Sequence, residues 1–271
     1  MSRETLRSFL CRARRLFVIT GAGVSAPSGI DTYRDHSGAW RRSAPIQHQD
    51  FLRKPEARRR YWARSMRGWP AFRDARPNPA HHALAALEQR GRVQVVVTQN
   101  VDGLHQRAGQ ERLVELHGSL ARVLCLSCGE GRARDDLQSW LEARNGDWLR
   151  DAVAARPDGD AEFLTVRQFA DFAEPSCQCG GVLKPDVVFY GDSVPKARVE
   201  HVRSELDQAD AVLVVGSSLM VYSSFRFLKA AKSRSLPLAA VNLGRTRADD
   251  WLDCKWEADS AVALPELLAT I

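Results

Sequence analysis

The 271-residue sequence has no apolar run that approaches the roughly 18 residues needed to cross a membrane. Its first apolar run begins at Leu16, which leaves too little chain ahead of it for a signal or transit peptide. These two absences predict a cytoplasmic protein with no membrane partner. The large excess of Arg over Lys and the abundance of Ala are typical of bacterial proteins. Hydrophobic residues still make up 44% of the chain, so a sizeable core can form and a disordered chain is not expected.

Lysine is scarce and arginine abundant, and the formal net charge is +6 with an isoelectric point near 9.2. Such a balance suits nucleic acid or a small anionic ligand. The arginines are scattered over many segments, however, and only Arg58, Arg59 and Arg60 form a run. Scattered charges are typical of a solvated surface. We therefore expect no specific nucleic-acid partner, and we also expect a monomer.

Cysteine is limited to six residues, and without an export signal three disulfides are not the natural interpretation. Four of the cysteines form two close pairs, Cys125 with Cys128 and Cys177 with Cys179. Four thiolates satisfy one tetrahedral structural Zn²⁺ ion, and we predict that site here. The pairs are farther apart than in common zinc ribbons, and the second has one intervening residue instead of two, so a set of reduced thiols is the alternative.

Short apolar runs alternate with segments of helical character, which predicts an α/β fold with a parallel, doubly wound sheet of the Rossmann type. The expected strands span residues 16–20, 93–98, 113–116, 211–215 and 238–241. A helix is expected to begin at Asn78 and Pro79, which suit the N-cap and the first helical position. Gly91 is expected to end that helix.

Two segments interrupt this alternation. Residues 123–181 begin and end near the cysteine pairs and contain no long apolar run, so we expect a small inserted zinc-binding module there. Residues 41–76 are rich in arginine and aromatic residues, with a helical stretch near residues 51–66, and we expect a small helical module. The Rossmann-type domain then comprises residues 1–40, 77–122 and 182–271.

Each expected strand ends in small or polar residues. In a parallel sheet the carboxyl ends of the strands lie at one edge, where ligands bind. Glycines in Gly21-Ala22-Gly23 would let the backbone approach a pyrophosphate, but the next glycine is Gly29, so the spacing differs from the Gly-x-Gly-x-x-Gly of common dehydrogenases. Five polar strand ends at one edge favour a polar ligand site over five unrelated turns.

His117 is the candidate catalytic base because it directly follows an apolar strand at this edge. The ordinary pKa of histidine, near 6.5, lets it accept a proton close to neutral pH. The alternative is a core histidine bonded to a backbone carbonyl. His81, His82 and His105 compete on composition alone, and only position favours His117.

Taken together, the motifs resemble the sirtuin family, in the right order over nearly the whole chain. They are Gly21-Ala22-Gly23-Val24-Ser25 with Gly29-Ile30, Thr98-Gln99-Asn100-Val101-Asp102, His117-Gly118-Ser119, the two cysteine pairs, the run from Lys184 to Asp192, Gly216-Ser217-Ser218, and Val241-Asn242. The long gap between the cysteine pairs and the segment Arg60 to Arg64 look like the class II branch, which includes mitochondrial and bacterial members.

The resemblance implies a Rossmann-type NAD-binding domain, NAD as co-substrate, one structural Zn²⁺, and acylated-lysine proteins or peptides as substrates. His117 and Asn100 would be catalytic, and Val187, Val188, Phe189 and Gly191 would pair with the substrate peptide as an added strand. The residues implied to bind NAD are Gly21, Ala22, Gly23, Ser25, Ile30, Tyr33, Arg34, Gln99, Asn100, Asp102, Gly216, Ser217, Ser218, Asn242, Leu243 and Ser260.

The chemistry implied by the resemblance transfers the acyl group to ADP-ribose. The acyl oxygen attacks C1′ of the nicotinamide ribose, nicotinamide leaves, and His117 takes a proton from a ribose hydroxyl. Three positions depart from the family pattern. Asp31-Thr32 replaces a common Pro-Asp, the pair Cys177 and Cys179 is short, and Tyr190 replaces a common Phe.

Tyr61 and Arg64 lie three residues apart on an expected helix, so both can face one way. Related class II enzymes grip acidic acyl chains with such a pair, and the hypothesis is that acidic or longer acyl groups are preferred over acetyl. The alternative is that Arg64 is one more solvated arginine. Two other functions stay open: NAD hydrolysis or mono-ADP-ribosyl transfer in the same site, and a non-catalytic NAD-sensing module.

Overall fold

The computed structural model describes residues 3–32, 45–150, 153–155, 161–163 and 169–271. The chain divides into two compact units. Unit 1 comprises Met1–Arg41, Arg76–Leu116 and Val194–Ile271, and unit 2 comprises Arg42–Ala75 and His117–Ser193. The segments expected as a helical and a zinc-binding module thus lie in one unit. Among the described residues, no helix is both long enough and apolar enough to cross a membrane.

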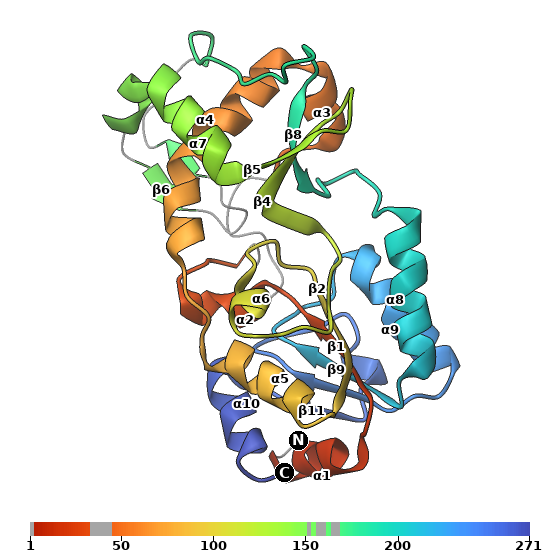
Figure 1. Ribbon diagram of the computed structural model, residues 1–271. Coiled ribbons are helices and arrows are strands. Elements are labelled where there is room, and N and C mark those ends of the chain that lie inside the picture. The colour runs from red at the N-terminus through yellow and green to blue at the C-terminus, as the bar shows by residue number, and fades with distance from the viewer. Residues whose placement is uncertain (1–2, 33–44, 151–152, 156–160, 164–168) are drawn as a thin grey trace. The chain divides into compact units, whose positions relative to one another are not determined.

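Unit 1 is built on a parallel sheet of six strands in the order β11-β10-β9-β1-β2-β3 (Figure 1). The predicted doubly wound parallel sheet is therefore confirmed. The strands are β1 Leu16–Thr20, β2 Val93–Thr98, β3 Leu113–Glu115, β9 Ala211–Val215, β10 Leu238–Val241 and β11 Cys254–Trp256. The strand β11, a three-residue edge strand that carries a lysine, was not predicted. The order reverses between β1 and β9, and parallel sheets bind ligands beyond such a reversal.

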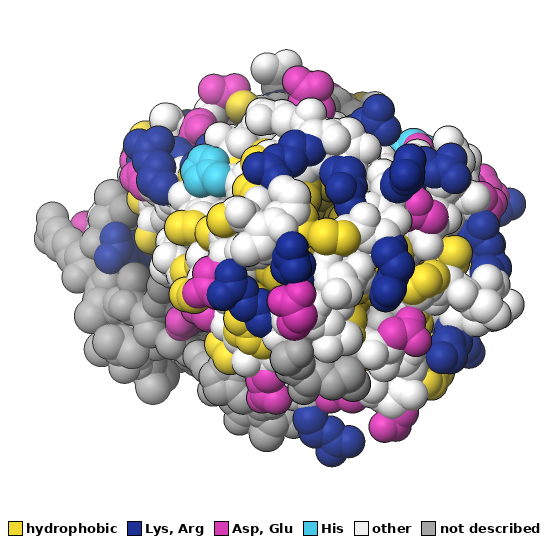
Figure 2. All heavy atoms as spheres, turned by 90° about the horizontal axis from the view of Figure 1, so that it is seen from below, with side chains coloured by type: hydrophobic (Ala, Val, Ile, Leu, Met, Phe, Trp, Pro, Cys, Tyr) yellow, Lys and Arg dark blue, Asp and Glu magenta, His cyan; other side chains and the backbone are white. Residues whose placement is uncertain are grey.

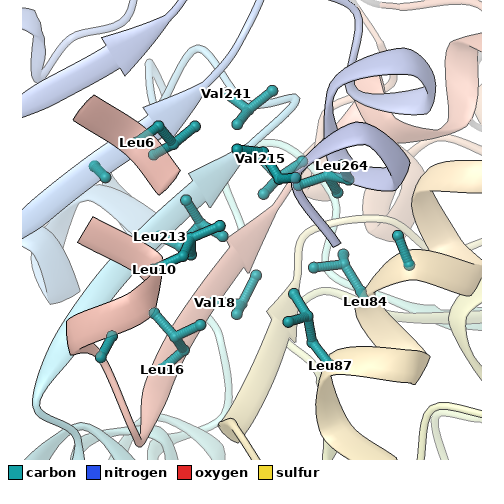
Figure 3. Packing of buried hydrophobic residues seen from close by; sticks show 14 of the residues in the cluster. Leu6, Leu10, Leu16, Val18, Leu84, Leu87, Leu213, Val215, Val241 and Leu264 are labelled. Carbon is teal, nitrogen blue, oxygen red and sulfur yellow. The ribbon is translucent and has the colours of Figure 1, made fainter. Parts of the chain in front are cut away.

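The helices of unit 1 cover both faces of this sheet, because side chains alternate along β1. Leu16 and Val18 point into one apolar cluster with leucines of α1, α5 and α10 (Figure 3). Phe17 points to the other face and meets Phe227 of α9 with a ring separation of 6.2 Å. The helices are α1 Arg3–Arg12, α2 Ala22–Ser25, α5 Pro79–Gln89, α6 Leu104–Arg107, α8 Lys196–Gln208, α9 Tyr222–Ser233 and α10 Ser260–Leu268, with 3-10 turns at Ala26–Ser28 and Asp249–Trp251.

The start of α5 follows from its sequence. The Asn78 side chain accepts a hydrogen bond from the Ala80 amide at 2.9 Å, and Pro79 is the first helical residue. The Asn78 amide bonds back to Nδ1 of His81 at 3.3 Å, which completes a capping box. The predicted N-cap is confirmed. The side-chain nitrogen of Asn78 donates to the Val24 carbonyl and to Ser28 Oγ, both at 2.8 Å. These two bonds fix the loop that follows β1.

Unit 2 combines two helices from the first half of the chain with a small antiparallel sheet in the order β5-β4-β8. The strands are β4 Gly118–Cys125, β5 Gly131–Ala133 and β8 Leu183–Val187, with a separate pair β6 Val153–Ala155 and β7 Ala161–Phe163. The helices are α3 His48–Arg53, α4 Pro55–Asp74 and α7 Arg134–Arg144, with a 3-10 turn at Gly146–Arg150. The expected helix near residues 51–66 is divided at Lys54, because Pro55 begins a new helix.

Charged side chains are interspersed on the face of the molecule that Figure 2 shows. Lys and Arg side chains lie among Asp and Glu side chains there, with hydrophobic atoms between them. Elsewhere among the described residues, surface ion pairs include Arg3 with Glu266 and Arg234 with Asp207. This face therefore presents no continuous basic surface of the kind that binds a nucleic-acid backbone.

Candidate active site

The turn after β1 crosses the end of β9 at very short range. The Gly23 amide donates to the Gly216 carbonyl at 2.8 Å. A Cβ on Gly23 would lie 2.8 Å from that carbonyl oxygen, and one on Gly216, whose φ is +57°, would lie 2.4 Å from the Val24 amide. Glycine is therefore needed here for chain crossing. The predicted contact of this turn with NAD phosphates stays a prediction, and the amide of Gly23 is already occupied by Gly216.

A hydrogen-bond network joins the ends of β1, β2 and β9 in unit 1. Gln99 donates to Ser217 Oγ at 2.7 Å and to the Thr20 carbonyl at 3.2 Å. The Gln99 carbonyl oxygen accepts from Ser224 Oγ at 2.9 Å. With both ends of the amide engaged, its orientation is set. Three of the predicted polar strand ends therefore meet, as expected for one edge of a parallel sheet.

Asn100 and Asp102 are held by a second branch centred on Ser25. Asn100 donates to Ser25 Oγ at 2.9 Å and to the Gly21 carbonyl at 3.0 Å. Ser25 Oγ donates to Asp102 Oδ2 at 2.6 Å. Burial raises the pKa of Asp102, while the Ser25 hydroxyl and the Leu104 amide oppose that shift. These three predicted NAD-binding residues thus form one preorganised polar cluster in unit 1.

The remaining predicted NAD-binding residues of unit 1 divide by exposure. Ile30, Ser217, Asn242 and Ser260 are buried, whereas the side chain of Leu243 is exposed. The Asn242 amide is turned onto its own loop and donates to the carbonyls of Leu243 and Gly244. Tyr33 and Arg34, also predicted to bind NAD, lie outside the described residues.

Ser224 and Thr20 are members of this region that the sequence analysis did not select. Ser224 lies in the first turn of α9 and fixes the Gln99 carbonyl. The Thr20 hydroxyl pairs with His105 Nε2 at 3.0 Å. No motif marks Ser224, because its only signal is a serine in the first turn of a helix, which is common for reasons of helix formation alone.

Two of the competing histidines are core residues. His81 and His105 are buried, with ring centroids 4.8 Å apart. Burial lowers the pKa of His81 to about 4 and that of His105 to about 3. Both are therefore neutral near pH 7, which argues against either one as the catalytic base. The choice of His117 stays a prediction.

His117 is the first residue of the second segment of unit 2 and is part-exposed. The next residue, Gly118, pairs with Val187 of β8 and has a φ of +85°. A Cβ on Gly118 would lie 2.0 Å from the Asp186 carbonyl oxygen, so only glycine allows this close pairing. The His117 carbonyl accepts from the Val188 amide at 2.8 Å. The candidate base is thereby tied to the segment predicted to bind the substrate peptide.

The segment Val187 to Gly191 is braced from within unit 2. The buried Lys184 ammonium donates to the Val187 carbonyl, lies 4.5 Å from the Phe189 ring centroid, and pairs with Asp192 at 3.8 Å. Burial lowers the pKa of Lys184, and Asp192 opposes that shift. The Tyr190 carbonyl accepts from the His48 amide at 2.8 Å.

Tyr61 of α4 is buried against this segment. Its ring lies 5.3 Å from the ring of Phe189 and 5.5 Å from that of Phe51. Arg64, one turn further along α4, is part-buried. The structure therefore brings Tyr61 to the predicted peptide segment, as the acyl-pocket hypothesis requires.

The four predicted zinc ligands form one cluster. All four sulfur atoms lie within 4.8 Å of one another, with Cys125 and Cys179 3.6 Å apart and Cys128 and Cys177 3.8 Å apart. A tetrahedral zinc ion with bonds of about 2.3 Å requires sulfur separations of about 3.8 Å, so the donors fit. The backbone amides of Cys128 and Ser127 lower the pKa of the Cys125 thiol to about 6, which favours the thiolate.

The short second cysteine pair is compatible with this geometry. Gly181 passes so close to the cluster that a Cβ would lie 2.6 Å from Cys125 Sγ. The Cys177 amide bonds to the Gly181 carbonyl at 3.0 Å. The close approach of Gly181 and its bond to Cys177 let the shorter pair bring both thiols to the cluster. We conclude that the cluster can hold one structural zinc ion, with all four tetrahedral positions supplied by the protein.

These features are those of an α/β protein with a polar cluster at one edge of a parallel sheet in unit 1 and a four-thiol cluster that can hold a metal ion in unit 2. A model of the Sir2 family matches residues 21–223. An NAD-dependent protein deacetylase 2 of Bradyrhizobium diazoefficiens is 51% identical over 269 residues, which cover 99% of this chain and 98% of that protein. The mitochondrial NAD-dependent protein lipoamidase sirtuin-4 of Bos taurus is 47% identical, over 97% of this chain and 84% of that protein.

Solved structures of Sir2 enzymes also resemble this chain. A Sir2 variant holding a deacetylated p53 peptide and 3′-O-acetyl ADP ribose superposes with a TM-score of 0.81 at 27% identity, covering 100% of this chain and 98% of that chain. A Sir2 enzyme structure at 33% identity covers 98% and 96%, with a TM-score of 0.78. The chain belongs to the Sir2 family. The predicted resemblance to sirtuins is confirmed, while the assignment to the class II branch stays a prediction.

Proposed function

We propose that the chain uses NAD to remove acyl groups from protein lysine side chains, and that it removes acidic acyl groups such as succinyl or glutaryl faster than acetyl. The first part is the NAD-dependent deacylation of the Sir2 family, to which the chain belongs. The second part concerns the substrate of this particular chain. It is supported by Tyr61 and Arg64 on α4.

One observation carries the proposal: the His117 carbonyl bonds to the Val188 amide at 2.8 Å. A peptide that adds as a strand to Val187–Gly191 would thus lie next to the residue that bears the imidazole. Tyr61 contacts Phe189 on the same segment. The base, the peptide segment and one side chain of the proposed acyl pocket are therefore brought together within unit 2.

In the proposed reaction the acyl group moves from the lysine nitrogen to a ribose hydroxyl of ADP-ribose, nicotinamide leaves C1′, and one water molecule is consumed as the lysine amine is freed. His117 takes the proton of the ribose hydroxyl that becomes acylated, which a neutral imidazole does near pH 7. The Asn100 side-chain nitrogen donates to the Gly21 carbonyl and to Ser25 Oγ, which fixes the orientation of this amide within unit 1. The zinc cluster supplies no group to this chemistry and stabilises unit 2.

Tyr61 and Arg64 would recognise a terminal carboxylate through a phenol and a guanidinium. Arg–carboxylate pairs are often bidentate and are among the stronger hydrogen-bonded contacts. Acetyl has no group that reaches them. A preference for acidic acyl groups of about one to two orders of magnitude is the expected consequence of one such contact.

The test is a series of peptides of one sequence that carry acetyl-, succinyl- or glutaryl-lysine, assayed with NAD for O-acyl-ADP-ribose. We expect Arg64→Met to lower kcat/KM for the two acidic groups at least tenfold and to leave deacetylation nearly unchanged. Arg60→Met, which removes an exposed arginine from the same helix, is the matched control. Equal loss on all three substrates would contradict the acyl preference.

The same assay separates the other functions. NAD hydrolysis or ADP-ribosyl transfer would consume NAD without acyl-peptide and would form no O-acyl-ADP-ribose. A non-catalytic NAD sensor would show no turnover at all. For a deacylase, His117→Ala is expected to lower kcat by about 10²–10⁴-fold, as the loss of a general base does. Unchanged turnover in His117→Ala would show that His117 is not the general base.

A further inference from the structure

Arg134 is a cation buried in unit 2, and among the described residues it forms no ion pair with a carboxylate. It is the first residue of α7 and is 1% exposed. Its guanidinium donates to Ser65 Oγ at 3.3 Å and lies 5.8 Å and 5.2 Å from the ring centroids of Trp62 and Trp69. The atom Nη1 is buried and has no hydrogen-bond partner among the described residues. Burial lowers the pKa of Arg134 to about 10, so it stays charged at neutral pH.

The part of unit 2 that the structure describes places no carboxylate in contact with the Arg134 guanidinium. A buried ion normally has a paired counter-ion, because the loss of hydration is costly. The amino end of a helix carries partial positive charge and adds to that cost. The next residue, Asp135, is exposed, and its carboxylate is engaged by the Trp69 indole N–H at 2.7 Å and by Arg73 at 3.7 Å. Ring faces offset only part of the cost.

A continuous row of aromatic contacts leads from Arg134 to the predicted peptide segment. Trp62 meets Tyr61 edge-to-face with ring centroids 5.2 Å apart. Tyr61 in turn meets Phe189 at 5.3 Å. Trp62 contacts both the Tyr61 ring and the Arg134 guanidinium, so a ligand that contacts Tyr61 comes within the electrostatic field of that buried charge.

We propose that Arg134 is a specificity-determining positioning residue for the acyl chain, a buried positive charge behind Tyr61 that favours a carboxylate at the end of that chain. This inference rests on the proposed acidic-acyl preference. Arg134 acts through Tyr61 and through its field, whereas Arg64 would touch the carboxylate. In a poorly solvated interior such a field is weakly screened and persists beyond contact distance.

The experiment compares glutaryl-lysine with pentanoyl-lysine in one peptide, since the two acyl chains have equal length and only glutaryl ends in a carboxylate. We expect the wild-type chain to favour glutaryl. Arg134→Met should lower the glutaryl-to-pentanoyl ratio of kcat/KM about tenfold while pentanoyl turnover changes little. Arg134→Lys should keep most of the ratio. Arg144→Met, which removes an exposed arginine from the same helix, should leave the ratio unchanged.

A second variant separates charge from packing, because Arg134→Met removes both. Ser65→Asp keeps Arg134 and gives it a counter-ion. We expect Ser65→Asp to lower the glutaryl-to-pentanoyl ratio of kcat/KM several-fold while its unfolding temperature stays equal to that of the wild type or rises. If Arg134 only joined α4 to α7, Ser65→Asp would leave the ratio unchanged, and Arg134→Met would lower both substrates equally.

The outcomes distinguish this inference from the proposed function. A wild-type chain that favours glutaryl, with the ratio unchanged in Arg134→Met and in Ser65→Asp, overturns the role of Arg134 alone. A wild-type chain that removes pentanoyl as fast as glutaryl overturns the acidic-acyl preference, and the role of Arg134 with it. A lowered ratio in Ser65→Asp supports the inference even if Arg134→Met fails to fold.

Discussion

The two units organise their functional residues by different physical means. In unit 1, polar side chains such as Gln99 and Asn100 are satisfied by one another and by backbone carbonyls, so their orientation is set before any ligand arrives. In the described part of unit 2, the main features are the aromatic contacts around Tyr61, the thiol cluster, and the buried cation Arg134, whose Nη1 has no hydrogen-bond partner there. Under the function proposed above, unit 1 would bind the co-substrate through its preorganised polar groups, and unit 2 would determine which acyl group is preferred.

The largest expected difference between the units is their dependence on metal. Cys177→Ser, or chelation of zinc, should unfold the cluster and the β5-β4-β8 sheet, since structural zinc in small modules contributes about 10–16 kcal/mol of binding free energy. Hydrogen exchange should then rise in unit 2 while the strands of unit 1 stay protected.

Cys11→Ser is the control for that prediction, because Cys11 is exposed and outside the cluster. It should retain one zinc per chain by elemental analysis. Loss of protection in both units at the same zinc occupancy would show that they do not differ in this respect.

A smaller difference is expected in acid. The folded chain holds His81 and His105 neutral, with pKa values lowered to about 4 and about 3, while the unfolded chain protonates them near pH 6.5. The unfolded state therefore binds more protons as the pH falls. Stability from this pair is complete above pH 6.5 and is lost as the pH falls towards 4 and then 3, on the order of 1–2 kcal/mol per histidine between pH 7 and pH 5.

Urea unfolding between pH 7 and pH 4, followed by the hydrogen exchange of unit 1, measures this loss. His105→Gln should flatten the pH dependence, whereas His201→Asn, at an exposed position on α8, should not. A pH dependence that is unchanged in His105→Gln would assign the acid sensitivity to other groups.

The smallest effect is expected from Ser224→Ala, which frees the Gln99 carbonyl. One hydrogen bond contributes about 0.5–1.5 kcal/mol, so KM for NAD should rise about three- to tenfold with little change in the glutaryl-to-acetyl ratio. Ser233→Ala, at the exposed end of α9, is the control. A change in acyl preference in Ser224→Ala without a change in KM for NAD would contradict the proposal that unit 1 binds the co-substrate and unit 2 sets the acyl preference.

Much of unit 1 was predictable because its signals are local. The apolar strands β1, β2, β9 and β10 lie where their runs of valine and leucine placed them, and Asn78 caps α5 as its sequence indicates. The strand β11 was not predictable, since Cys254–Trp256 is short and carries a lysine. Its strand conformation comes from pairing with β10 at the sheet edge.

The sequence by itself determined the parallel sheet, the polar ends of its strands, the four zinc-binding thiols and the family. Each of these depends on residue types at a given spacing, and both can be seen in the sequence without knowing which segments meet in space. Only the tertiary structure decided that Gly23 and Gly216 serve a chain crossing, that Ser224 orients Gln99, and that Arg134 is buried. These depend on which segments meet in space, and a buried arginine among many scattered ones has the same sequence signal as a solvated one.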